Sequence, residues 1–141
     1  MKNLLLLLGT LVSLTSFTQV GNIRVQVNSL KSEKGAVLIY LYQNENGFPT
    51  DPKKAWKAVK VAIESNAADH TFTNIPFGNY AVTIAHDENG NDVLDTNFIG
   101  IPKEGIGTSN NAKGSFGSPR FADAKFQHQK NETLINIKVS Y

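Results

Sequence analysis

The feature that most constrains the fold is a hydrophobic period of two residues that recurs between short turn signals. Apolar and polar residues alternate over residues 23–27, and the alternation returns over 133–141, where Ile135, Ile137 and Val139 are apolar. Such alternation is typical of a strand with one buried face, whereas an amphipathic helix repeats every 3.6 residues. The pattern therefore predicts a chain built almost entirely from strands.

Turn residues divide the rest of the chain into five more predicted strands. Residues 36–42 are apolar on both faces, as expected of a central strand. The other four strands are predicted at 59–63, 70–75, 80–86 and 121–127. Asp51 and Pro52 supply an N-cap and a proline suited to the first helical position, so one short helical turn is expected over Pro52 to Trp56. Seven short strands with so little helix predict an all-β, mostly antiparallel β-sandwich.

The N-terminus predicts export. Lys2 precedes an apolar run over residues 4–14, and the small residues Ser16 and Thr18 follow it. The run is shorter than the roughly 20 apolar residues of a membrane span. We therefore expect residues 1–18 to be a cleaved signal peptide, with an uncleaved anchor as the alternative. Residues 19–141 would then form one exported domain, periplasmic or secreted, with no membrane span after cleavage.

Composition narrows the possible functions. The chain contains no Cys, which excludes disulfides, thiol chemistry and cysteine-based zinc sites. Six acidic residues and no Lys or Arg lie between Val61 and Pro102, and this acidic stretch favours a cation over a nucleic acid. A group of lysines at 53–60 lacks the density of a nucleic-acid surface and is interpreted as a solvated face.

The acidic stretch contains the best candidate site, a loop over residues 87–95. Asp87, Asn89, Asn91 and Asp95 place side-chain oxygens at loop positions 1, 3, 5 and 9, and Val93 offers a backbone carbonyl. Ca²⁺ prefers oxygen ligands in this kind of array. The loop is therefore a predicted structural Ca²⁺ site.

Two departures from an EF-hand loop keep a second interpretation open. Asp92 occupies the position of the turn glycine, and Phe98 replaces the bidentate glutamate at position 12. Affinity would then be weak, in the range of about 10⁻⁴–10⁻³ M known for extracellular modules. The alternative is a hairpin loop stabilised only by its own side-chain-to-backbone hydrogen bonds.

A glycine-rich loop over residues 96–120 is the second candidate, for ligand binding. Loops this long without secondary structure are often functional. Its aromatic residues could stack on a sugar or anchor a peptide. The interpretation we favour is a structural lid that covers one open sheet edge, with its Phe residues in the core. The candidate binding residues are Asn97, Phe98, Ser109, Asn110, Asn111, Lys113, Phe116 and Arg120.

Catalytic chemistry finds little support. There is no Gly-x-Ser-x-Gly elbow and no Cys nucleophile. Asp87 and Asp95 could be interpreted as a glycosidase pair, but they are better explained as loop ligands. The three histidines, at 70, 86 and 128, are expected to be ordinary surface or edge residues rather than a zinc site. An aromatic strip containing Trp56 is more typical of a core than of a carbohydrate platform.

Several motifs carry a resemblance. Residues 74–82, Asn-Ile-Pro-Phe-Gly-Asn-Tyr-Ala-Val, resemble the turn and strand of transthyretin-like and carboxypeptidase-regulatory-like sandwiches. The segments 86–91, 94–105 and 109–114 resemble an exported bacterial family known as domain of unknown function 2141, over essentially residues 22–140. The resemblance implies a small exported sandwich and no established activity. The C-terminus reads Lys-Val-Ser-Tyr, not the Tyr-Arg-Gly-Ser end of transthyretin-related hydrolases.

Together these observations predict an exported, non-enzymatic β-sandwich that serves as a binding or scaffold module of the cell envelope. Its expected partner is a protein or a carbohydrate, with no nucleic acid, and its expected cofactor is a structural Ca²⁺. Two alternatives remain: a carbohydrate- or peptide-binding protein that uses residues 96–120, and a hydrolase of unknown substrate.

Overall fold

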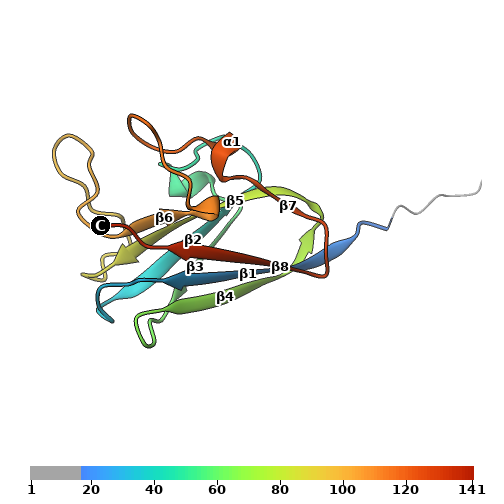
Figure 1. Cartoon of the computed structure of the whole chain (residues 1–141), viewed down its shortest axis with the longest axis horizontal. Coiled ribbons are helices and arrows are strands. Elements are labelled where there is room, and N and C mark those ends of the chain that lie inside the picture. Colours follow the sequence, from blue (N-terminus) through green and yellow to red (C-terminus); the bar gives the residue numbers. More distant parts are fainter. Residues whose placement is uncertain (1–16) are drawn as a thin grey trace, which may run out of the picture.

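The computed structural model of the protein describes residues 17–141 and contains two β-sheets packed face to face. Figure 1 shows them as two layers, with loops gathered above the larger sheet. Residues 1–16, which hold most of the predicted signal peptide, lie outside the described residues. The predicted β-sandwich is confirmed, with eight strands among residues 17–141 instead of the predicted seven.

The smaller sheet has three strands and joins the two ends of the described chain. Its central strand is β1 (Val20–Asn28), which pairs antiparallel with β4 (Ala68–Pro76) and parallel with β8 (Glu132–Lys138). The exposure of β1 alternates along its length, as its period of two predicts. β8 behaves in the same way, because Ile135 and Ile137 are buried while their neighbours face solvent.

The larger sheet has five strands, all paired antiparallel. β2 (Ala36–Tyr42) lies between β3 (Lys57–Val61) and β5 (Gly78–Asp87). The far side of β5 pairs with two three-residue strands. These are β6 (Ile106–Thr108), beside the second half of β5, and β7 (Phe126–His128), beside its beginning.

The hydrophobic core fills the space between the two sheets. Its residues on the smaller sheet are Ile23, Val25, Val27, Ala68, Phe72, Ile75, Ile135 and Ile137. Its residues on the larger sheet are Val37, Ile39, Leu41, Tyr80, Val82 and Ile84. Burial of these side chains removes apolar surface from water, which is the main driving force for folding.

The outer face of the larger sheet is covered as well, which explains why β5 is buried from Tyr80 to Asp87. An aromatic stack forms part of this cover. Phe48, in the loop after β2, lies edge-on between Tyr42, at 5.3 Å between ring centroids, and Phe121, at 5.7 Å. The continuous apolar sequence of β2 is thus that of a central strand with two covered faces.

Helical structure is confined to single turns. η1 (Pro52–Lys54) confirms the predicted turn and its cap, because the N–H of Lys53 donates to the Asp51 carboxylate at 3.2 Å. η2 (Ser109–Asn111) and α1 (Phe121–Ala124) were not predicted. Among the described residues, no helix is long and apolar enough to cross a membrane.

The predicted strand over 121–127 is wrong for most of its length. α1 occupies its first four residues, and only Phe126–His128 pairs as a strand. The ring of Phe121 packs against Phe48 on the outer cover, and the side chain of Arg120 pairs with Asp123 at 2.9 Å across the helical turn. These local contacts override the apolar alternation of the segment.

Candidate functional site

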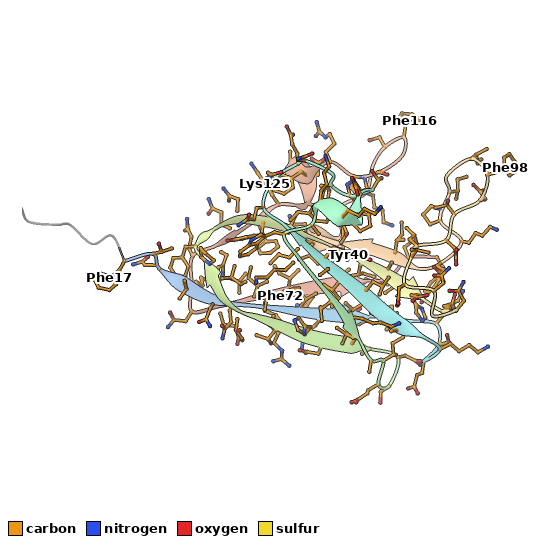
Figure 2. All side chains as sticks on the ribbon, turned by 180° about the vertical axis from the view of Figure 1, so that it is seen from behind. Phe17, Tyr40, Phe72, Phe98, Phe116 and Lys125 are labelled. Atoms are coloured by element: carbon orange, nitrogen blue, oxygen red, sulfur yellow. The ribbon has the colours of Figure 1, made fainter. Side chains whose placement is uncertain are left out.

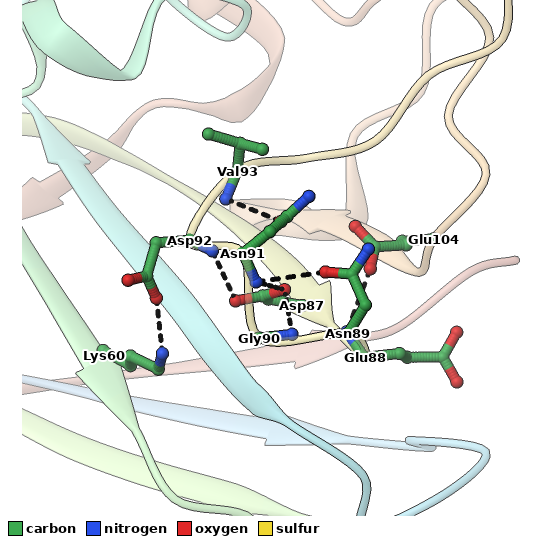
Figure 3. Close-up of polar contacts among 9 residues, drawn as sticks. All are labelled: Lys60, Asp87, Glu88, Asn89, Gly90, Asn91, Asp92, Val93 and Glu104. Carbon is green, nitrogen blue, oxygen red and sulfur yellow. Dashed lines mark hydrogen bonds and ion pairs between the residues drawn. The ribbon is translucent and has the colours of Figure 1, made fainter.

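The loop over residues 87–95 begins where β5 leaves the larger sheet, and it is organised around one buried carboxylate. Asp87 is the last residue of β5 and is completely buried. Its carboxylate accepts backbone N–H groups from Gly90 at 2.9 Å, Asn91 at 3.1 Å and Asp92 at 2.9 Å (Figure 3). The position of Asp87 at a strand end therefore lets one side chain hold the following turn.

The two asparagines of the loop connect this turn to Asp95. Their side-chain oxygens accept backbone N–H groups two residues further on, from Asn91 and Val93, each at 3.1 Å. Their side-chain nitrogens donate to the Asp95 carboxylate, at 2.6 Å from Asn89 and 3.1 Å from Asn91. The structure thus brings the four predicted side chains into one hydrogen-bonded cluster, while the side chain of Val93 faces solvent.

Asp92 adopts the backbone conformation that a turn glycine usually supplies. Its φ is +64°, in the left-handed region that Asp and Asn tolerate better than most residues. The departure from the EF-hand pattern at this position therefore leaves the turn intact. The exposed carboxylate of Asp92 pairs with the ammonium group of Lys60 on β3, and this hydrogen bond raises the pKa of Lys60.

Glu104 completes the site and was missed by sequence reasoning. Its side chain is buried, with a relative exposure of 7%. One carboxylate oxygen accepts the N–H of Glu88 at 2.9 Å, and the other accepts the N–H of Asp95 at 3.1 Å. Glu104 thereby ties together the two ends of the loop. The available signal was that no other acidic residue lies between positions 96 and 122.

The hydrogen bonds within the loop occupy its polar side chains, as the alternative of a self-stabilised hairpin loop requires. Within residues 17–141, no group of three or more His, Cys, Asp or Glu side chains is close enough to hold a metal ion. A bound Ca²⁺ would need the amide oxygens of Asn89 and Asn91 to turn toward Asp95. Ca²⁺ binding by Asp87, Asn89, Asn91, Val93 and Asp95 therefore stays a prediction.

The histidines do not converge, and two of them differ from expectation because they are fully buried. His86 Nε2 lies 2.8 Å from the Lys34 carbonyl oxygen, and its Nδ1 lies 2.6 Å from the Tyr141 hydroxyl. Since the carbonyl oxygen only accepts, Nε2 carries the proton. His128 is held in the same way, between the carbonyl oxygen of residue 75 and the hydroxyl of residue 133. Both imidazoles therefore act as structural hydrogen-bonding groups.

Four polar candidates in the 96–120 loop stabilise the loop itself. The hydroxyl of Ser109 is buried, donates to the Ala124 carbonyl at 2.6 Å and accepts the N–H of Val82 at 2.9 Å. Asn110 donates to backbone carbonyls of the α1 segment, and Asn111 accepts the N–H of residue 138. Asn97 accepts the N–H groups of residues 99 and 101. These side chains shape the loop, although Asn110 and Asn111 stay exposed to solvent.

The aromatic candidates of the same loop behave in the opposite way. Phe98 has a relative exposure of 98% and Phe116 of 104%, so the expectation that they pack down into the core is wrong. Figure 2 shows both rings at the tips of two loops that project from the body of the sandwich. The side chain of Lys113 is also exposed, while Arg120 pairs with Asp123. Among the candidates only Ser109 is buried, four polar side chains are hydrogen-bonded to backbone groups, and the two phenyl rings are free in solvent.

Trp56 offers a poor carbohydrate platform. Its ring stacks on the buried ring of Tyr80, with centroids 5.8 Å apart, and the Lys57 ammonium lies 4.8 Å from the indole centroid. A sugar needs a free aromatic face, whereas neighbours engage this indole although it is 38% exposed. The tips at Phe98 and Phe116 are the more accessible aromatic groups.

Comparison with known proteins gives a family without an assigned activity. A family model described as "Uncharacterized protein conserved in bacteria (DUF2141)" matches residues 25–136. No curated protein and no solved structure gives a significant match. The resemblance to transthyretin-like sandwiches therefore stays a prediction.

Proposed function

Because the chain belongs to the uncharacterised bacterial family DUF2141, we propose from its own residues that it is an exported, non-catalytic binding module of the cell envelope. The apolar tips of the 96–120 loop would contact the partner. The larger sheet and the acidic loop after β5 would hold these tips in place. Export to the periplasm or the medium follows from the N-terminal segment and is part of the proposal.

The observation that carries this proposal is the complete exposure of two phenyl rings at the tips of two loops. The rings of Phe98 and Phe116 remain in contact with water, and burial of each ring against a partner would contribute about 1.5–3 kcal/mol of favourable free energy. Exposed apolar residues that gather on one side of a domain mark an interaction site. Recognition residues are commonly carried on loops of a rigid scaffold, and the sandwich is such a scaffold.

The polar groups of the loops support a role without catalysis. A general base or nucleophile has to reach a substrate. The carboxylates of Asp87 and Glu104 are buried and accept backbone N–H groups, and the Ser109 hydroxyl is buried against β5. If these three groups serve to hold the loops, the alternative of a hydrolase has few side chains left that could act as a base or a nucleophile.

Site-specific photocrosslinking in a bacterium that produces the protein tests the proposal. A photoreactive phenylalanine analogue replaces Phe98 or Phe116, and a matched control replaces Leu134, an exposed residue of β8 on the other sheet. We expect the protein in the envelope or medium without residues 1–18, and adducts at the two tips that the control lacks. A cytoplasmic protein, or equal labelling at all three positions, would refute the proposal.

We further propose that the loop over residues 87–95 binds Ca²⁺ and stiffens the base of the tip loop. The observation that favours this proposal is the conformation of Asp92. Its N–H donates to the Asp87 carboxylate and its φ is in the left-handed region, as expected for the turn residue of a Ca²⁺ loop, where a glycine is usual. For a Kd near 10⁻⁴ M, 10 mM Ca²⁺ should raise the free energy of unfolding by about 2.7 kcal/mol over EDTA.

Thermal unfolding measures this effect directly. A midpoint that rises by several degrees with Ca²⁺ but not with Mg²⁺, and no longer rises in Asp95→Ala, would support the site. Asp95 is the matched choice because its carboxylate is only half-buried and accepts mainly from the side chains of Asn89 and Asn91. Equal midpoints in EDTA and Ca²⁺ would leave the self-stabilised hairpin loop as the correct interpretation.

A further inference from the structure

The two loop tips have the shape of an inserting surface and not of a pocket. Phe98 and Phe116 project into solvent from separate loops, and Figure 2 shows both pointing away from the body on the same side. Ile99 and Ile101 flank Phe98 and are also exposed. An isolated convex tip contacts little of a flat protein surface, but it fits a soft medium that closes around it.

The Phe98 tip is a built turn, so its exposure is a property of the fold. The N–H of Asn97 donates to the Ile101 carbonyl at 2.8 Å, and its side-chain oxygen accepts the N–H groups of Ile99 and Ile101 at 3.0 and 2.9 Å. Below it, the N–H of Lys103 donates to the Asp95 carbonyl at 2.8 Å. These bonds use the polar groups of the tip internally and leave its apolar side chains facing outward.

The exposed charges of the segment that carries the tips are basic, whereas the loop over residues 87–95 at the base of the Phe98 tip carries the carboxylates of Asp92 and Asp95. Between residues 96 and 122 the basic residues are Lys103, Lys113 and Arg120, and the single acidic residue, Glu104, is buried. Arg120 is paired with Asp123, which leaves Lys103 and Lys113 as the exposed basic residues of this segment without such a pairing. Long lysine side chains place their ammonium groups at the polar level of a membrane while their stems cover apolar surface.

We propose that the tips at Phe98 and Phe116 insert into the headgroup region of a membrane that contains anionic phospholipid, and that Lys103 and Lys113 contact its phosphates. The inference rests on the proposed function, of which it specifies the partner. Aromatic and aliphatic side chains beside lysines are the composition that binds a membrane interface. A sugar would need free polar groups beside the ring, whereas the side-chain oxygen of Asn97 at the Phe98 tip already accepts two backbone N–H groups of its own turn.

Vesicle co-sedimentation of the purified protein tests the proposal. The vesicles contain phosphatidylcholine alone or with 30% phosphatidylglycerol, and EDTA is present so that Ca²⁺ does not bridge acidic groups. We expect binding to the anionic vesicles that weakens in high salt. Each Phe→Ala change should reduce the partition coefficient by about tenfold or more, because one ring no longer leaves water. Each Lys→Gln change should reduce it by about fivefold, on anionic vesicles only.

Leu134→Ala is the matched control, because it removes an exposed apolar side chain from the other sheet. The Leu134→Ala variant should bind vesicles as the unchanged protein does. All variants should keep the unfolding midpoint of the unchanged protein, since the altered side chains are exposed. Three results would overturn the inference: no binding, equal binding by Phe98→Ala/Phe116→Ala, or equal binding to neutral vesicles. Tip-specific crosslinks to a protein without vesicle binding would refute the lipid partner and leave the proposed function standing. Absence of both would refute both.

Discussion

The Asp87 carboxylate should be the largest single polar contribution to the stability of the acidic loop, and Asp87→Asn tests it with almost no change in shape. The carboxylate is completely buried and accepts three backbone N–H groups, at 2.9, 3.1 and 2.9 Å. In the Asn variant, one oxygen still accepts from Gly90 and Asn91. The new amide nitrogen faces the N–H of Asp92, and two donors then meet.

The expected cost follows from these contacts. A hydrogen bond to a charged group contributes about 1.5–3 kcal/mol, and a buried donor left without an acceptor costs about 1–3 kcal/mol. One lost bond together with two weakened bonds gives about 3 kcal/mol for Asp87→Asn. For a domain of this size, that lowers the thermal midpoint by roughly 10 °C.

Urea unfolding in EDTA measures the free energy without any contribution from metal. Trp56 is the only tryptophan and stacks on core residue Tyr80, so its fluorescence reports global unfolding. The slope of the unfolding free energy against urea concentration should not change, since unfolding exposes the same surface in both proteins. Asp92→Asn is the control: it keeps a residue that tolerates the left-handed turn and removes only an exposed ion pair, so stability should hardly change. If the free energy of unfolding of the Asp87→Asn variant lies within about 0.5 kcal/mol of that of the unchanged protein, the carboxylate does not organise the loop.

Three further predictions concern the surroundings of this loop. A Cβ at Gly35, where φ is +69°, would overlap the backbone that ends β5, so Gly35→Ala should lower the free energy of unfolding by at least about 3 kcal/mol. Gly90 has a φ of +74° but open space around it, so Gly90→Ala should lower it by only about 1 kcal/mol. Equal losses for the two variants in urea unfolding would contradict the overlap. Tyr141→Phe removes the hydroxyl beside His86 Nδ1 and should cost about 1 kcal/mol, with an unchanged midpoint as the contrary result. Burial lowers the pKa of His70, so its contribution to stability is present above the unfolded pKa of about 6.5 and is lost as pH falls below it; an NMR titration midpoint at or above 6.5 would contradict this sign.

The strands could be predicted because side-chain alternation and burial are locally linked. β1 and β8 bury their apolar positions as the alternation requires, and β2 has the two covered faces that its apolar sequence predicts. The Asp51 cap was predictable for the same reason, since its partner is two residues away. β6 was missed because its three residues, with a central glycine, are too few to show a period.

The site was predictable in its acidic half and not in its apolar half. Asp87 to Asp95 follow one another along the chain, so the spacing of their oxygens is visible in the sequence. Glu104 joins this loop through backbone N–H groups across a turn that no pattern indicates. Phe98 and Phe116 were expected to be buried from hydrophobicity alone, yet exposure depends on where the loop backbone runs. The two buried histidines likewise depend on distant carbonyl and hydroxyl partners.

The parallel pairing of β1 with β8 has a consequence for the order of events during biosynthesis. The register joins Asn22 to Glu132 and Asn28 to Lys138, so these partners are separated by almost the whole length of the domain. The three-stranded sheet stays incomplete until residues 132–138 have left the ribosome, and contacts between such distant segments form slowly. A chain that still lacks β8 is therefore without the core residues Ile135 and Ile137, and the space between its two sheets is open along that edge.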